Sequence, residues 1–285
     1  MAPLNFIAFA DGEASPHHCL RYASTLAQAV HGQVLQLRVG GQSVTHSGRL
    51  AAEFCSPDDL RCQATAASEL ASVAQELRAR PTRQVIPDLP PALVQELADH
   101  HHPLVFVLSQ RYPDEDPDDS VATTCADLLQ TSYPVLVVPL TAPAGRVPRR
   151  ILIAADREPF QLAPNSLPLR QLLALPDAEL LTVHVAGVLE DGLGYDLADK
   201  AVLGSGLVDD LPAPELRGYE YGSYPRGLLA AVRDTHADLV VVLARQRSYF
   251  SDLFHRSVTA RLLESCPVPV LVLPTAPTEA DHWLS

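Results

Sequence analysis

The sequence predicts an α/β protein built from two tandem, doubly wound parallel-sheet domains. Short apolar runs rich in β-branched residues alternate with helical patterns, and the whole pattern occurs twice. Continuous apolar runs are typical of parallel strands buried on both faces, and their alternation with helices predicts a doubly wound sheet. The composition is that of a globular protein, since 47% of the 285 residues are hydrophobic and 19% are charged.

Three pairs of apolar runs establish the internal repeat. The first pair is LNFIAF (4–9) and RILIAA (150–155), and the others are PLVFVL (103–108) with DLVVVL (238–243) and PVLVVP (134–139) with PVLVLP (269–274). Two copies of one unit explain all three pairs. Pro, Gly and Arg between the copies favour a linker. The expected organisation is domain 1 at 1–141, a linker at 142–149, domain 2 at 150–277 and a C-terminal tail at 278–285.

Helical patterns lie between the predicted strands of both halves. The first helix of the first half has an apolar face formed by Leu20, Ala23, Leu26, Ala27 and Val30. Further helices are expected at 57–79 after the N-cap residue Ser56, at 90–101 with Pro at its start, and at 121–131. The second half predicts helices at 167–175, 196–203, 226–236 and 258–265, and its glycine-rich segment 187–218 is interpreted as a lid over a cleft.

Charge and motif content exclude several classes of function. Lys and Arg number 21 against 34 Asp and Glu, and a net charge of −13 without a basic stripe argues against nucleic acid. No apolar run approaches the ~20 residues that span a membrane, so no membrane association is expected. The start of the sequence does not resemble a signal peptide, and the five cysteines form no CxxC pair, so a cytoplasmic location is expected.

No catalytic set and no metal site are predicted. The sequence has neither a G-x-S-x-G elbow nor an H-E-x-x-H motif. The consecutive residues His100, His101 and His102 would point in different directions on a helix and cannot all face one metal ion. The acidic loop 114–119 lacks the calcium-loop pattern and is interpreted as a solvated loop, with cation attraction left open as an alternative.

Four features, in order and repeated, resemble the universal stress protein family in its tandem two-domain form. The first strands end near Asp11 and Asp156, and the other features are LQLRV (35–39) with LTVHV (181–185), ADLVVV (237–242), and SVTARLLESCPVPVLVLP (257–274). The resemblance implies Rossmann-like domains of the adenine nucleotide alpha hydrolase-like type, within the HUP superfamily. It also implies an internal pseudo-dimer in which 134–139 pairs with 269–274, and it leaves association into a homodimer open.

The nucleotide-binding glycines of that family are degenerate in this sequence. Glycines let backbone amides approach ribose and phosphates, and a helix N-terminus then receives the phosphate charge. In the second half the glycine positions hold Leu243, Gln246 and Arg256, although Ser257 is kept. In the first half they hold Leu108 and Arg111, and the loop carries five carboxylates before Ser120. No cofactor is therefore expected, and ATP or another adenine nucleotide remains an alternative in domain 2.

The candidate site residues follow from the resemblance. In domain 2, Asp156 and Val185 occupy positions that flank an adenine pocket, and Ser257 follows the degenerate loop. Arg245, Arg247 and Arg256 are candidates to hold an anion with side chains instead of backbone amides, and a solvated loop is the alternative. The equivalent cleft of domain 1 has Asp11, Val39 and Ser120.

Three functions are considered. The main prediction is a non-catalytic stress-response or signalling protein that binds a protein partner or a small ligand. The first alternative is an adenine-nucleotide switch with weak hydrolysis through the domain 2 cleft. The second alternative is a carrier of an apolar ligand.

Overall fold

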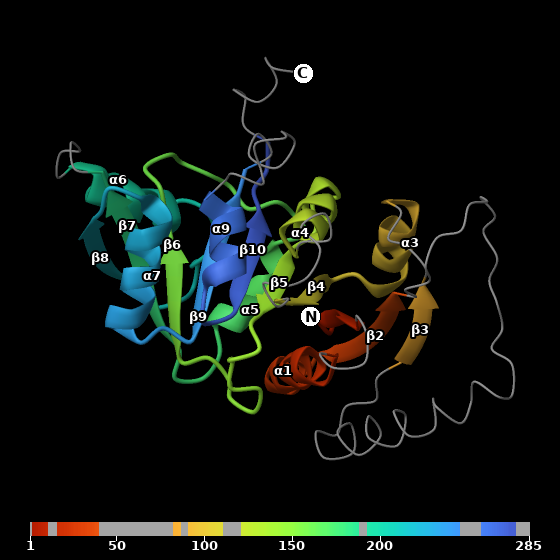
Figure 1. Cartoon of the computed structure of the whole chain (residues 1–285). Coiled ribbons are helices and arrows are strands. Elements are labelled where there is room, and N and C mark those ends of the chain that lie inside the picture. Colours follow the sequence, from red (N-terminus) through yellow and green to blue (C-terminus); the bar gives the residue numbers. More distant parts are fainter. Residues whose placement is uncertain are drawn as a thin grey trace, which may run out of the picture.

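A computed structural model of the chain describes residues 2–10, 16–39, 82–86, 91–110, 121–187, 193–245 and 258–277. These residues form one mixed α/β unit around a ten-stranded sheet with the strand order β3-β2-β1-β4-β5-β10-β9-β6-β7-β8. Figure 1 shows the sheet running from β8 at one side of the molecule to β3 at the other. The predicted fold class is confirmed, and the two halves share one continuous sheet.

Eight of the ten described strands coincide closely with the predicted runs, whereas the edge strands β3 and β8 were not among those runs. Their bounds are β1 Asn5–Ala10, β2 Gln33–Val39, β3 Thr82–Ile86, β4 Leu104–Ser109, β5 Val135–Val138, β6 Arg150–Ala154, β7 Glu179–Ala186, β8 Glu215–Glu220, β9 Leu239–Ala244 and β10 Val270–Pro274. All residues of β5 and β10 are buried. Burial on both faces explains why these strands are continuous apolar runs instead of alternating ones.

The strand order repeats in the two halves. From the outer edge inward, the first half reads β3-β2-β1-β4-β5 and the second reads β8-β7-β6-β9-β10. Neighbouring strands are parallel except at the junction, where β10 pairs antiparallel with β5 and Leu271 lies opposite Leu136. The predicted pairing of the two final strands is therefore confirmed. The domain bounds inferred from the repeat stay a prediction.

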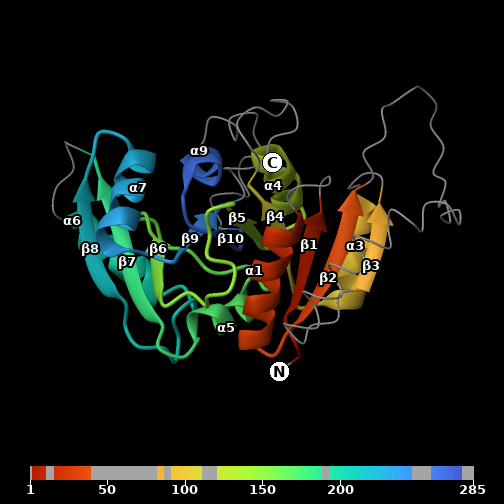
Figure 2. The same ribbon diagram turned by 60° about the horizontal axis from the view of Figure 1, so that its bottom comes forward.

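Helices cover both faces of the sheet. The described helices are α1 Pro16–Ala29, α3 Pro91–His101, α4 Val121–Gln130, the 3₁₀ turn η2 Leu167–Leu169, α5 Arg170–Leu173, α6 Leu193–Leu203, α7 Tyr224–Thr235 and α9 Val258–Ser265. One core layer packs beneath α3, α4, α7 and α9. The other packs beneath α1, α5 and α6, and Figure 2 shows α1 in front of the sheet. Each layer contains residues of both halves.

Three helix predictions need correction or stay open. The expected helix 167–175 is reduced to a 3₁₀ turn and a single α-turn. The segment predicted as a lid contains α6, which packs on the sheet and buries Ala198 and Val202 completely. The expected helix 57–79 lies outside the described residues. No helix in the described ranges combines the length and apolar character needed to cross a membrane.

The predicted linker is fastened to both halves. The Thr25 hydroxyl on α1 donates a hydrogen bond of 2.7 Å to the carbonyl oxygen of Ala144. One carboxylate oxygen of Asp238 accepts the backbone N–H groups of Arg149 and Arg150, at 3.0 and 2.9 Å. These contacts fix the entry of the chain into β6, and so they fix the position of the residues that follow β6.

Candidate functional site

The candidate site lies at the point where the strand order of the second half reverses. The chain leaves β6 toward β7 on one side, and β9 lies on the other side of β6. In open α/β sheets the crevice outside the carboxyl ends of two such strands is the usual ligand site. Asp156 follows β6 and Arg245 follows β9 directly, so the sheet brings these two predicted residues to the same crevice.

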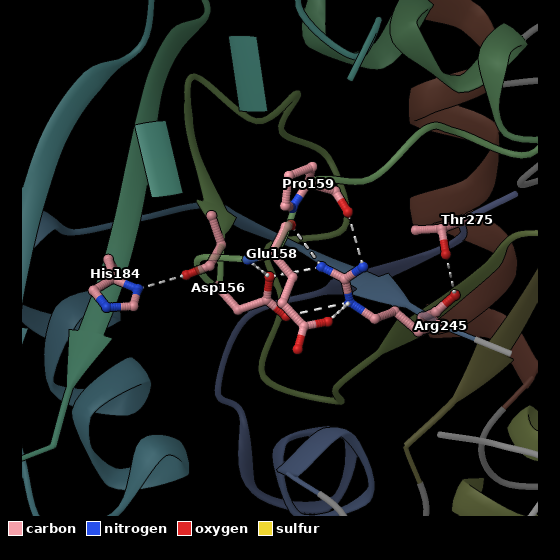
Figure 3. A network of polar contacts seen from close by, with 8 residues as sticks. Asp156, Glu158, Pro159, His184, Arg245 and Thr275 are labelled. Atoms are coloured by element: carbon pink, nitrogen blue, oxygen red, sulfur yellow. Dashed lines mark hydrogen bonds and ion pairs between the residues drawn. The ribbon is translucent and has the colours of Figure 1, made fainter. Parts of the chain in front are cut away.

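The Arg245 side chain is directed to the loop after β6 and bonds to it (Figure 3). Its Nη2 donates to Asp156 Oδ1 and to the carbonyl oxygen of Glu158, both at 2.7 Å. Its Nε donates to Asp156 Oδ2 at 3.3 Å, and its Nη1 donates to the carbonyl oxygen of Pro159 at 3.2 Å. The Glu158 carboxylate lies 3.7 Å from Nε. Every nitrogen of the guanidinium is thus engaged within the chain.

Burial makes this contact more than a surface ion pair. The Arg245 side chain is only 10% exposed, whereas that of Asp156 is 51% exposed. A two-pronged arginine–carboxylate contact fixes both direction and distance, and charged hydrogen bonds are stronger than neutral ones. The backbone beside Arg245 is also held, because Ala244 accepts the backbone N–H of Thr275 at 3.0 Å. The Arg245 side chain, which was predicted to hold an external anion, therefore binds the Asp156 carboxylate of the same chain.

Val185, the second predicted residue of the crevice, is covered by α7. Val185 is 5% exposed. A Cβ added at Gly227 would lie 2.4 Å from Val185 Cγ1, so the α7 backbone rests directly on this side chain. Tyr224 begins the same helix, and burial raises the pKa of its phenol, with the negative charge of Asp156 raising it further. The wall of the crevice on this face of β7 is thus closed by protein.

His184 occupies the opposite face of β7 and is covered by α6. It is buried, and its Nδ1 lies 3.0 Å from the carbonyl oxygen of Ala155, so Nδ1 carries the donated proton (Figure 3). Its ring meets that of Tyr195 edge to face, with centroids 5.6 Å apart. A Cβ at Gly194 would lie 3.1 Å from His184 Nε2, so α6 also approaches closely. His184 therefore serves the loop after β6 by fixing Ala155.

The corresponding position of the first half is occupied by Gln110. Gln110 directly follows β4, as Arg245 follows β9. Its amide Nε2 donates a hydrogen bond of 2.7 Å to the carbonyl oxygen of Leu263 on α9, in the other half of the chain. Val39 is the last residue of β2, where it pairs with Ile86 of β3, and its place in a cleft stays a prediction. Asp11 and Ser120 lie outside the described residues.

The structure brings together part of the predicted site. Asp156 and Arg245 are in contact, and Val185 lies on β7, the strand next to β6. The other three candidates lie outside the described residues: Arg247, Arg256 and Ser257. Glu158, Pro159 and Gly227 were not predicted. The first two contribute backbone carbonyls, which every residue has, so no sequence signal marks them. The acidic loop 114–119 is also outside the described ranges. Within the described ranges, no group of three or more His, Cys, Asp or Glu side chains could hold a metal ion.

The sheet order and the contact between Arg245 and Asp156 define a doubly wound α/β protein in which an arginine after β9 binds the loop after β6. Residues 216–274 match the model of the Universal stress protein family, so the resemblance drawn from the sequence is confirmed for that part of the chain. No curated protein matches the chain.

Solved structures share the fold over almost the full length. A universal stress protein from Archaeoglobus fulgidus DSM 4304 has a TM-score of 0.62 at 16% identity, covering 94% of this chain and 97% of that one. A candidate universal stress protein from Pseudomonas aeruginosa UCBPP-PA14 has a TM-score of 0.56 at 15% identity, covering 96% and 94%. The cytoplasmic domain of a prokaryotic cation chloride cotransporter has a TM-score of 0.56 at 13% identity, covering 99% and 100%. At these identities the likeness concerns the fold alone.

Proposed function

We propose that this protein is a non-catalytic universal stress protein that acts in stress response or signalling by binding a protein partner or a small ligand. In this proposal the crevice of the second half does not serve as an adenine-nucleotide site. The observation that carries the proposal is the contact between Arg245 and Asp156, with both prongs of the guanidinium on the carboxylate. An adenine base that bound to Asp156 would first have to displace the buried Arg245 side chain from this carboxylate.

Two further features support the same conclusion. The α7 backbone at Gly227 covers the Val185 side chain, so an adenine base could not pack against Val185 on this face of β7. The loop after β6 also directs the Asp156 and Glu158 carboxylates to solvent, with 51% and 56% of their side chains exposed. The bulky residues Leu243 and Gln246 at the glycine positions agree with this reading.

The experiment has two steps on the full chain. Freshly purified protein is denatured and its supernatant is analysed for adenine nucleotides, and native protein is then titrated with ATP·Mg²⁺ by calorimetry. The expected result is no co-purified nucleotide and no binding heat at millimolar ATP. About one bound nucleotide per chain would contradict the proposal. Loss of that binding in the triple variant R245A/R247A/R256A would then establish the alternative, a nucleotide switch held by arginines.

A further inference from the structure

The chain that leaves β5 packs against α1 before it reaches β6. A turn closes where the Ala142 N–H donates to the Pro139 carbonyl at 3.0 Å, and Ala142 is buried in the same core layer as α1. Two residues further on, the carbonyl of Ala144 accepts the Thr25 hydroxyl of α1 at 2.7 Å. We name residues 139–144 the clasp, because they hold the connection between the halves against α1.

The clasp is also attached to the second half. The Thr141 hydroxyl donates a hydrogen bond of 3.0 Å to the carbonyl of Pro267, which lies between α9 and β10. The clasp therefore touches a helix of one half and the approach to the central strand of the other. A change that weakens its contact with α1 loosens the joint between the halves.

His18 lies in the first turn of α1, where the clasp packs against it. The carbonyl oxygens of Pro139 and Ala142 interact with its ring. Its Nε2 is buried, and within the described part of the chain this atom has no hydrogen-bond partner. A proton added to Nε2 would be a buried donor, which is costly when it stays unpaired. The first turn of a helix also disfavours a cation, because the N-terminal end of the helix dipole is positive.

The charges around His18 act in the same direction as its burial. Burial lowers the pKa of His18 below 6.5, and the positive charge of Arg21 on the same helix lowers this pKa further, while the two carbonyls of the clasp oppose the shift without cancelling it. The clasp itself contains no ionisable side chain. Tyr22, the next residue after Arg21, stays neutral because burial raises the pKa of its phenol. Residues 11–15, which precede α1, lie outside the described residues.

We propose that the clasp is an acid-sensitive device, in which protonation of His18 weakens the attachment of the clasp to α1 and loosens the joint between the two halves. Above pH 6.5 the ring is neutral whether the clasp is closed or open. As the pH falls below 6.5, the open form takes up the proton first, because its ring is hydrated, and the equilibrium shifts toward opening. The device is separate from the crevice of the second half, so it goes beyond the proposed function.

The test is hydrogen exchange of the full chain, measured by mass spectrometry at about pH 7.5 and about pH 5.5 and corrected for the intrinsic exchange rate. The probes are the amides of Ala142 and Arg146, each of which donates a hydrogen bond of 3.0 Å within this connection. In the wild type, the opening equilibrium should rise several-fold at the lower pH, and by at most about tenfold for each pH unit. His18→Gln has no group to protonate and should give the same opening equilibrium at both pH values.

Two control variants separate titration from the loss of a contact. Thr25→Val removes the hydrogen bond to Ala144 without changing a titrating group, and it should raise the opening equilibrium by the same factor at both pH values. His100→Gln removes a histidine at the end of α3, away from the clasp, and should keep the acid response of the wild type. His18→Leu replaces H18Q if the glutamine variant does not fold, as judged by circular dichroism.

An acid response that survives in a folded His18 variant would overturn the proposal, as would a wild type whose clasp opens equally at both pH values. ATP binding to the wild type would instead contradict the proposed function, so the two failures are distinguishable.

Discussion

Arg245 and Arg217 form ion pairs of the same length in different surroundings, and their alanine variants should differ sharply in stability. Each pair has an N–O distance of 2.7 Å. The Arg245 side chain is 10% exposed, whereas the Arg217 side chain is 51% exposed and its partner Glu215 is 60% exposed. Arg245→Ala removes four hydrogen bonds to the loop 156–159 and leaves their acceptors to be satisfied by water.

The magnitude follows from the count and the exposure. At about 1 kcal/mol net for each hydrogen bond, the four bonds would contribute about 4 kcal/mol to the free energy of unfolding. Because Asp156 is half exposed, water recovers part of this, and we expect a loss of about 2–3 kcal/mol in R245A. An exposed pair contributes little, so R217A should lose less than about 0.5 kcal/mol.

Urea unfolding followed by circular dichroism measures both variants against the wild type. A loss of 2–3 kcal/mol would also lower the thermal midpoint by roughly 4–12 °C for a chain of this size. The reasoning would be refuted by equal losses in the two variants. It would also be refuted by an unchanged R245A, because that result would mean that the Asp156 contact contributes no more than a surface pair.

Two other predictions concern the walls of the crevice and its outer edge. Gly227→Ala places a Cβ 2.4 Å from Val185 Cγ1 and should lower the free energy of unfolding by about 1–2 kcal/mol, after the gain in helix propensity. The control Gly222→Ala has nothing within 4 Å of its Cβ and should change the free energy of unfolding by less than about 0.5 kcal/mol in the same urea assay. Equal effects of the two substitutions would contradict the close approach of α7. Burial, and then the hydrogen bond of 2.7 Å to Asp234, raise the pKa of Tyr219 from 10.0 to about 12. Because the raised pKa favours the neutral phenol in the folded state, this stabilisation is complete below pH 10 and is lost as the pH rises to 12. The difference in unfolding free energy between wild type and Tyr219→Phe should therefore shrink over that range, and a difference independent of pH would contradict the shift.

The repeat made most of the fold predictable. Apolar runs buried on both faces mark strands wherever they occur, and β5 and β10 coincide with PVLVVP and PVLVLP. The helix expected at 167–175 failed for a local reason. Pro168 lies in the first turn, where its missing N–H is tolerated, but Pro176 disfavours the α conformation at Leu175, so the segment keeps a 3₁₀ turn and a single α-turn that ends at Leu173.

The sequence pointed to Asp156 and Arg245 as candidate site residues, but it did not predict that they contact each other. Asp156 and Arg245 were both candidates, and each was assigned to an external ligand. Their contact joins residues 89 positions apart, and only the pairing of β6 with β9 brings them together. A sequence shows that an arginine is present beside a crevice, but the carboxylate that it meets depends on the sheet.

The two halves use the same position after the switch-point strand in opposite ways. Gln110 donates a hydrogen bond to the carbonyl of Leu263 in the other half, while Arg245 is bonded to the loop 156–159 of its own half. An amide on a helix carbonyl is a neutral contact that ties the halves together, and it leaves no charge to attract a ligand. The arginine contact, by contrast, combines a buried cation with two carboxylates half open to solvent. The equivalent position therefore joins the two halves in one copy of the repeat and anchors the loop after β6 in the other.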